Sequence, residues 1–134
     1  MIKLAFVFRT APYGSSDSRE GLDALLAATA FCDENEIAVF FIDDGVFNLP
    51  AEQRAELILQ RDFVNAVKLL DLYEIKNRYV CSQSLQRFGL FERNLAIFCE
   101  KIDRTSPFIF KRCRINLIPS TSRIGYEMCD ASFE

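Results

Sequence analysis

Two apolar runs, with a turn and an amphipathic stretch between them, form the first third of the chain. Ile2–Phe8 is almost continuously apolar, with β-branched and aromatic members, which is typical of a strand covered on both faces. Thr10–Ser16 concentrates Pro, Gly and Ser, residues that favour turns. Beyond this loop the pattern predicts a helix, capped by Asp17 or Ser18, because apolar positions recur on one helical face at Leu22, Leu25, Leu26 and Thr29.

The alternation of strands and helices continues towards residue 103. Ile37–Ile42, Arg78–Cys81 and Leu95–Cys99 are the next predicted strands. Helices are predicted at Ala51–Gln60, from Asp62 onwards, and at Ser82–Phe88, which Gly89 ends. Alternating strands and helices predict an α/β fold with a parallel sheet, helices on both faces, and any site at the carboxyl ends of the strands.

The sequence changes character at Arg104. Only Phe108–Phe110 and Ile115–Ile118 suggest short strands, and no helical or strand period is sustained between them. We therefore divide the chain into one α/β domain, residues 1–103, and an irregular tail, residues 104–134.

Composition restricts the function further. The chain has 134 residues, a net charge of −3 and 13 Phe, which fits one domain with a core of large rings. The negative charge argues against a general binder of nucleic-acid backbones. No apolar run is long enough to span a membrane and none reads as a signal peptide, so we expect a cytoplasmic protein.

The residues available for chemistry are few. There is no His, which excludes imidazole catalysis and His metal ligands. The five Cys are widely spaced without a C-x-x-C pair, so neither a disulfide framework nor a zinc site is expected. Asp43 and Asp44 could bind Mg²⁺ but are better interpreted as turn formers. We expect no metal and no cofactor.

Cys81 is the candidate catalytic residue. It ends the third predicted strand directly before a helix, where unpaired N–H groups and the helix dipole stabilise a thiolate. Arg87 would add positive charge if it folded back. The alternative is a small buried thiol that closes a strand. We assign Cys32 and Cys99 to the core. The Thr10–Ser18 loop could bind an anion before its helix, although ordinary loop structure explains it as well.

The residues in order resemble the TusC/DsrF family of sulfur-relay proteins, within the wider DsrE-like group, and within that family TusC most of all. The resemblance extends to about Asp103 and is carried by Phe6–Phe8, Thr10–Gly14, Arg19–Ala27, Ala38–Phe47, Arg61–Phe63, Lys68–Tyr73 and Val80–Cys81. Agreement in order over three quarters of a chain is far more specific than any single motif.

This resemblance implies a flavodoxin-like three-layer sandwich with a mainly parallel sheet. It also implies a cytoplasmic complex of TusB-like, TusC-like and TusD-like subunits, a heterohexamer built as a dimer of trimers. In that relay a persulfide passes through TusD to TusE and ends in 2-thiolation of the tRNA wobble uridine, and the DsrF branch serves dissimilatory sulfur metabolism. Cys81 resembles in position the sulfur-carrying thiol of TusD/DsrE. In the TusC branch, the thiol at this position is not thought to be the essential carrier.

Three functional interpretations follow. The first is a non-catalytic subunit of the sulfur-relay complex, with no direct contact to nucleic acid or membrane. The second is an active sulfurtransferase that carries a persulfide on Cys81, and the third is a flavodoxin-like module for a small ligand.

Residues 104–134 depart from the family pattern of a final helix and strand. We hypothesise a shifted reading frame or altered gene end, which would leave an open sheet edge.

Overall fold

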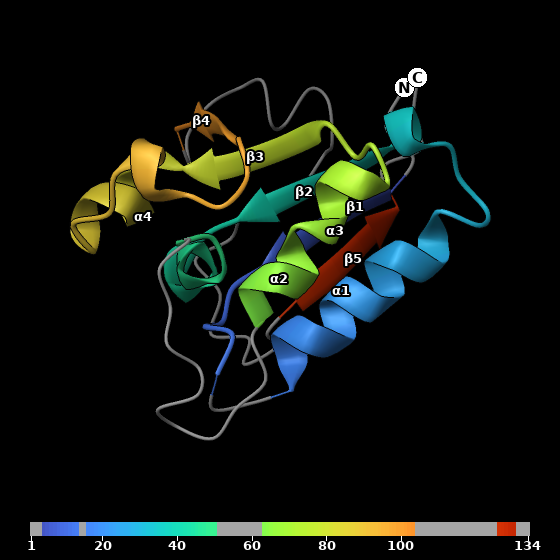
Figure 1. The fold of residues 1–134 in the computed structure, drawn as a ribbon, viewed down its shortest axis with the longest axis horizontal. Coiled ribbons are helices and arrows are strands. Elements are labelled where there is room, and N and C mark those ends of the chain that lie inside the picture. The colour runs from blue at the N-terminus through green and yellow to red at the C-terminus, as the bar shows by residue number, and fades with distance from the viewer. Residues whose placement is uncertain (1–3, 14–15, 51–62, 104–125, 131–134) are drawn as a thin grey trace.

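The computed structural model describes residues 4–13, 16–50, 63–103 and 126–130, with backbone alone for 63–64 and 126–130. The fold is built on a five-stranded sheet in the order β4-β3-β2-β1-β5 (Figure 1). The strands are β1 (Leu4–Phe8), β2 (Ile37–Phe41), β3 (Asn77–Cys81), β4 (Glu100–Ile102) and β5 (Tyr126–Asp130). Strands β1 to β4 are parallel and β5 is antiparallel to β1. The expected α/β fold with a mainly parallel sheet is confirmed.

Short helices connect the strands. The α-helices are α1 (Asp17–Ala28), α2 (Phe63–Val67), α3 (Leu69–Leu72) and α4 (Ser82–Arg87). In the described part of the chain, the 3₁₀ helices η1 (Glu34–Glu36), η2 (Asp43–Asn48) and η4 (Glu92–Asn94) form tighter turns between the longer elements. Of the helices predicted from the sequence, Ala51–Gln60 lies outside the described residues.

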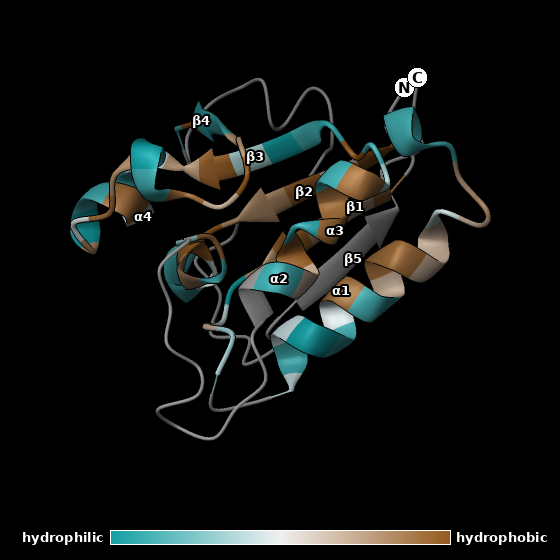
Figure 2. Ribbon diagram, in the orientation of Figure 1, coloured by the Kyte–Doolittle hydropathy of each residue, from teal (hydrophilic) through white to brown (hydrophobic). Residues whose placement is uncertain are grey.

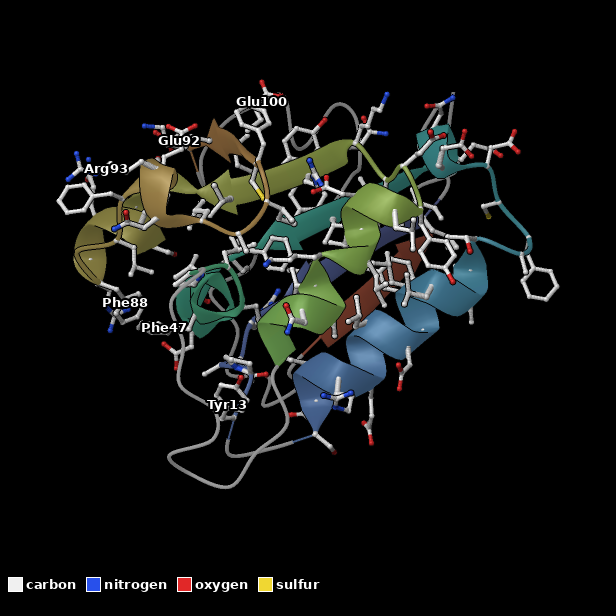
Figure 3. All side chains as sticks on the ribbon, viewed as in Figure 1. Tyr13, Phe47, Phe88, Glu92, Arg93 and Glu100 are labelled. Atoms are coloured by element: carbon white, nitrogen blue, oxygen red, sulfur yellow. The ribbon has the colours of Figure 1, made fainter. Side chains whose placement is uncertain are left out.

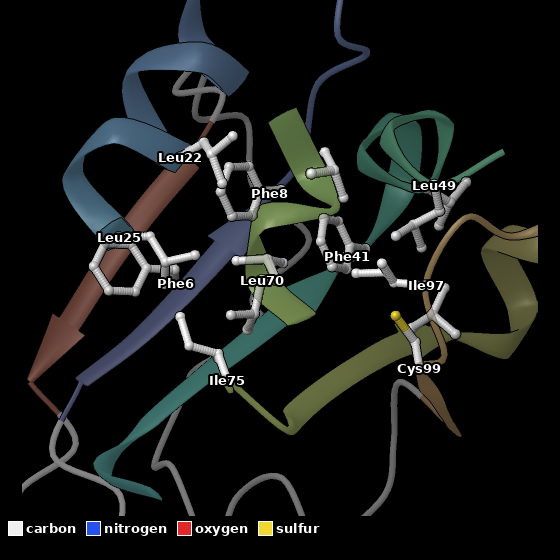
Figure 4. Packing of buried hydrophobic residues seen from close by; sticks show 14 of the residues in the cluster. Phe6, Phe8, Leu22, Leu25, Phe41, Leu49, Leu70, Ile75, Ile97 and Cys99 are labelled. Carbon is white, nitrogen blue, oxygen red and sulfur yellow. The ribbon is translucent and has the colours of Figure 1, made fainter. Parts of the chain in front are cut away.

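Side chains alternate between two apolar clusters on opposite faces of the sheet, as the pleat of a strand requires. The larger cluster takes Phe6 and Phe8 from β1, together with the buried apolar side chains of α1, α2, α3 and α4 (Figure 4). The smaller cluster contains Ala5, Val7, Ala38, Phe40, Ile42, Tyr79, Cys81 and Ile102. Both faces of β1 and β2 are therefore apolar, which is why these strands appear as continuous hydrophobic runs (Figure 2).

The order of the strands explains where these helices lie. Strands β1 to β4 are neighbours in sequence order, so each connection steps in the same direction across the sheet. Right-handed crossovers that all step in one direction place their helices on the same face. Within the described residues, the buried apolar side chains of the helices accordingly join the larger cluster alone. The helices that were expected on both faces of the sheet lie on one face in this part of the chain, and a second helical layer stays a prediction.

The predicted fourth strand was placed too early. The strand begins at Glu100, whereas Leu95–Cys99 was expected. Before it, the Ala96 N–H donates to the Leu49 carbonyl at 2.7 Å, and Leu95 forms an isolated bridge with Pro50. Ile97 and Cys99 are buried, as their apolar character indicated. The pattern therefore reported burial correctly, but it did not report which backbone the segment pairs with.

Two further expectations differ from the structure, one at the start of α1 and one in the tail. The N-cap of α1 is Ser16, not Asp17 or Ser18, and it makes no side-chain cap bond; its hydroxyl donates to Glu20 at 3.2 Å. In the tail, β5 pairs with the outer edge of β1, although the sequence predicted no strand there. The predicted strands Phe108–Phe110 and Ile115–Ile118 lie outside the described residues. The division of the chain at residue 103 stays a prediction.

Candidate functional site

Cys81 occupies the junction that the sequence predicted. It is the last residue of β3 and the N-cap of α4, with extended backbone angles (φ −71, ψ 118). Parallel pairing of β3 with β2 and β4 brings Cys81 opposite Ile102 at the carboxyl end of the sheet. The position was predicted correctly because an apolar strand followed by Ser82 marks a strand-to-helix turn.

The surroundings of the thiol are apolar and closed. Cys81 is only 1% exposed and belongs to the smaller cluster on the sheet face opposite the larger one. Its Sγ donates to the Gln83 Oε1 at 3.4 Å, and the Gln83 Nε2 donates in turn to the Asp103 Oδ1 at 2.7 Å. These bonds tie the start of α4 to the end of β4. They hold the thiol in place but do not expose it.

Arg87 does not add positive charge beside Cys81. It is the last residue of α4, at the opposite end of the helix from Cys81, and its guanidinium lies 5.4 Å from the centre of the Phe88 ring. The helix itself has six residues, so its dipole is small. The positive charge that the sequence allowed for is thus directed elsewhere.

The other described thiols differ in exposure. Cys99 is fully buried in the larger cluster, as predicted, and burial raises the pKa of its thiol to about 12. The positive charge of the Arg78 guanidinium lowers this pKa, but the effect of burial is larger. Cys32 is partly buried and packs against the larger cluster. The side chains of Cys113 and Cys129 lie outside the described residues.

The loop after β1 is fastened by its own polar groups. The Ser18 hydroxyl donates to the Thr10 carbonyl at 3.0 Å and lies 3.3 Å from the Thr10 Oγ1. The Asn48 side chain, which is fully buried, donates its Nδ2 hydrogens to the carbonyls of Thr10 and Gly45 at 3.0 and 2.8 Å. These groups stabilise the loop itself, which is the ordinary role weighed above. Asn48 was not among the candidate residues predicted from the sequence, in which only its place after a Gly-containing turn hinted at this role.

The paired carboxylates after β2 form a turn. Asp43 and Asp44 open η2, and the Asp43 N–H donates to the Ser84 Oγ at 3.0 Å, which joins this turn to α4. Among the residues that the structure describes, no three His, Cys, Asp or Glu side chains gather closely enough to hold a metal ion. The pair therefore lies in a turn, which is the interpretation that the sequence favoured.

Among the residues that the structure describes, two pockets open near β3 and β4, and Cys81 lines neither. One, of about 340 Å³, lies between the end of α3 and Phe98, beside the ion pair of Arg78 with Asp71. The other, of about 420 Å³, lies between α4, η4 and β4. In the described part of the chain, no helix is long and apolar enough to cross a membrane.

Comparison with known proteins identifies the family. The profile of the DsrE/DsrF-like family matches residues 2–106. The chain is 59% identical to a TusC homologue of Haemophilus influenzae over 104 residues, which cover 78% of this chain and 87% of the relative. It is 57% identical to a TusC homologue of Pasteurella multocida over 105 residues (78% and 88%), and 52% identical to TusC of Escherichia coli O157:H7 over 90 residues (67% and 74%). The chain belongs to the DsrE/DsrF-like family.

Proposed function

We propose that this chain is a non-catalytic subunit of a sulfur-relay complex that supports 2-thiolation of the tRNA wobble uridine. Its partners would be TusB-like and TusD-like subunits in a heterohexamer, and a TusE-like protein would accept the sulfur. Family membership and the similarity to proteins named TusC support the relay. The similarity extends over most of the chain and most of each relative.

The burial of Cys81 supports the non-catalytic role. Sulfur transfer between proteins requires a thiolate of one protein to approach a sulfur atom of the other directly, so both sulfur atoms must be accessible. The thiol of Cys81 is 1% exposed and lies among apolar side chains. A subunit built this way contributes structure and surface to the complex, while the sulfur is carried on a different subunit.

A complementation experiment tests this role. A strain that lacks the gene is complemented with wild type, Cys81→Ser or Cys81→Ala, and thiolated uridine in tRNA is measured by mass spectrometry of nucleosides. We expect deletion to abolish thiolation and both variants to restore it. Cys32→Ser, at a partly exposed thiol, is the matched control. Loss of thiolation in both Cys81 variants, with complex assembly intact, would contradict the proposal.

The second candidate is an active sulfurtransferase, favoured by the place of Cys81 at a strand end and helix start. In that reaction the Cys81 thiolate attacks the outer sulfur of a donor persulfide. A new S–S bond forms on Cys81, the donor S–S bond breaks, and the donor leaves as a thiolate. Incubation with a persulfidated donor, followed by intact mass, would show one added sulfur on wild type and none on Cys81→Ser. We expect no addition to either.

A further inference from the structure

The segment Ser82–Asn94, which we call the α4 tip, forms one end of the molecule. It comprises α4 and η4 and lies beyond β3 and β4, away from α1 (Figure 1). Its Phe91 is 59% exposed although it is a large aromatic side chain. An exposed ring beside a pocket indicates a surface that binds something.

The guanidinium groups of two arginines of the tip lie over aromatic rings. The Arg87 guanidinium lies 5.4 Å from the centre of the Phe88 ring, and the Arg93 guanidinium lies 5.2 Å from that of Phe91. Figure 3 shows Arg93 beside Glu92 on one side of the tip and Phe88 beside Phe47 on the other. A guanidinium held over a ring keeps N–H groups available, and these match the two oxygens of a carboxylate.

The charges of the tip are unbalanced. Its ionisable residues are Arg87, Glu92 and Arg93, and the Glu92 Oε2 lies 3.4 Å from the Lys101 Nζ of β4. Within the described residues, neither guanidinium has a carboxylate within the 4.0 Å of a salt bridge. The carboxylates of Glu100 and Asp103 belong to β4 and the residue after it, not to the tip. Two cations are therefore left for an external anionic partner.

The pocket of about 420 Å³ lies within the same surface. Apolar side chains of Leu85, Leu90 and Phe91 line it, and Gln86, Glu92 and Lys101 contribute polar lining. Its size and lining suit one large apolar side chain, such as Leu, Met or Phe. A pocket with apolar lining, on a surface that also carries two arginines beside aromatic rings, has the composition of a protein interface, in which aromatic residues and Arg provide most of the binding energy.

We propose that the α4 tip is the docking surface for an acidic segment of a partner protein. The segment places one large apolar side chain in the pocket and extends its carboxylates to Arg93 on one side of the tip and to Arg87, over Phe88, on the other. This inference rests on the proposed function, because the partner is another subunit of the relay complex. A protein fits better than RNA: the chain carries a net charge of −3, and two arginines neutralise too few phosphates for binding at physiological salt.

Binding measurements with the 134-residue chain test the surface. The dissociation constants for purified TusB-like and TusD-like subunits of the same organism are measured for wild type, Phe91→Ser and the double variant Arg87→Glu/Arg93→Glu. We expect each change to weaken binding to one of the two subunits by about tenfold or more. The loss for the double variant should shrink as salt is raised. Because these side chains are exposed, thermal unfolding should be almost unchanged.

Matched controls separate the tip from general surface effects. Phe31→Ser removes a ring that is 89% exposed elsewhere and lines neither pocket, and Lys68→Glu reverses an exposed charge outside both pockets. We expect these variants to bind as wild type does.

The outcomes distinguish this inference from the proposed function. If wild type binds a subunit and the tip variants bind equally well, the docking surface is wrong and the proposed function stands. If wild type binds neither subunit alone nor the two together, both are wrong. Titration of wild type with unmodified tRNA completes the test. Binding of tRNA that is lost in the Arg87→Glu/Arg93→Glu variant, with subunit binding unaffected, would assign the tip to nucleic acid and overturn the inference.

Discussion

The backbone of Gly45 lies against the carbonyl group of Phe8, so closely that a methyl group on Gly45 would stand 1.9 Å from the Phe8 oxygen. That oxygen also accepts the Ile42 N–H at 3.0 Å, so it cannot move without breaking a bond between the ends of β1 and β2. We expect Gly45→Ala to destabilise the fold by about 2–3 kcal/mol. Urea unfolding followed by circular dichroism measures the change.

Gly89 provides the comparison. It adopts φ 66, but an added methyl group would meet nothing within 4 Å. Gly89→Ala should therefore cost only the left-handed backbone penalty of about 1 kcal/mol. Equal losses of stability in the two alanine variants would show that the close approach of Gly45 to the Phe8 carbonyl does not determine the cost of the Gly45→Ala change.

Asn48 joins the loops after β1 and β2 through its amide. Its two Nδ2 hydrogens satisfy the carbonyls of Thr10 and Gly45 inside the protein. Asn48→Ala should lose about 1–3 kcal/mol because both acceptors lose this donor. Asn48→Asp should lose more, since it sets a carboxylate against two carbonyl oxygens. Asn94→Ala, at an exposed position, is the control for urea unfolding and should stay within about 0.5 kcal/mol. An Asn48→Ala variant as stable as that control would contradict this role.

Glu74 occupies a backbone position that favours glycine. It has φ 59 and follows α3 in a Schellman motif, in which the Ile75 N–H donates to the Leu70 carbonyl at 3.0 Å and the Glu74 N–H to that of Asp71 at 3.1 Å. Glu74→Gly should therefore stabilise the fold by about 0.5–1 kcal/mol in thermal unfolding. Glu74→Ala keeps the strained backbone and should give no gain. Stabilisation by alanine instead would point to the carboxylate, not the backbone, as the cause.

Local chemistry explains which of these features the sequence could predict. The β3 strand, the stop at Gly89 and the place of Cys81 follow from neighbouring residues, so the pattern predicted them. The pairing of residues 95–97 with Leu49 and Pro50 depends on distant parts of the chain, as does the approach of Gly45 to Phe8. Apolar periodicity records burial and carries no information about such partners. For the same reason the sequence could place Cys81 at a strand end but could not show that its thiol is closed off.

The buried thiol of Cys99 should make the stability of the fold depend on pH in the alkaline range. Its pKa is about 12 in the folded protein, whereas a thiol in an unfolded chain titrates near pH 8.5. Between these values the folded protein keeps a proton that the unfolded chain releases, so stability falls as pH rises. The protonated thiol contributes its full stabilisation of the fold below about pH 8.5. This stabilisation is lost as the pH rises towards 12, by up to about 1.4 kcal/mol per pH unit.

Urea unfolding of wild type and Cys99→Ala from pH 7.5 to 10.5 measures this contribution. Other groups titrate in the same range, so the difference between the two proteins isolates the thiol. Cys99→Ala should be less stable at pH 7.5, because it leaves a small cavity, and should lose stability less steeply at higher pH. Iodoacetamide at pH 8.5 should label Cys99 only in urea, because the folded protein holds this thiol protonated and buried. Parallel pH curves for the two proteins would mean that the thiol ionises as readily in the fold as in the unfolded chain.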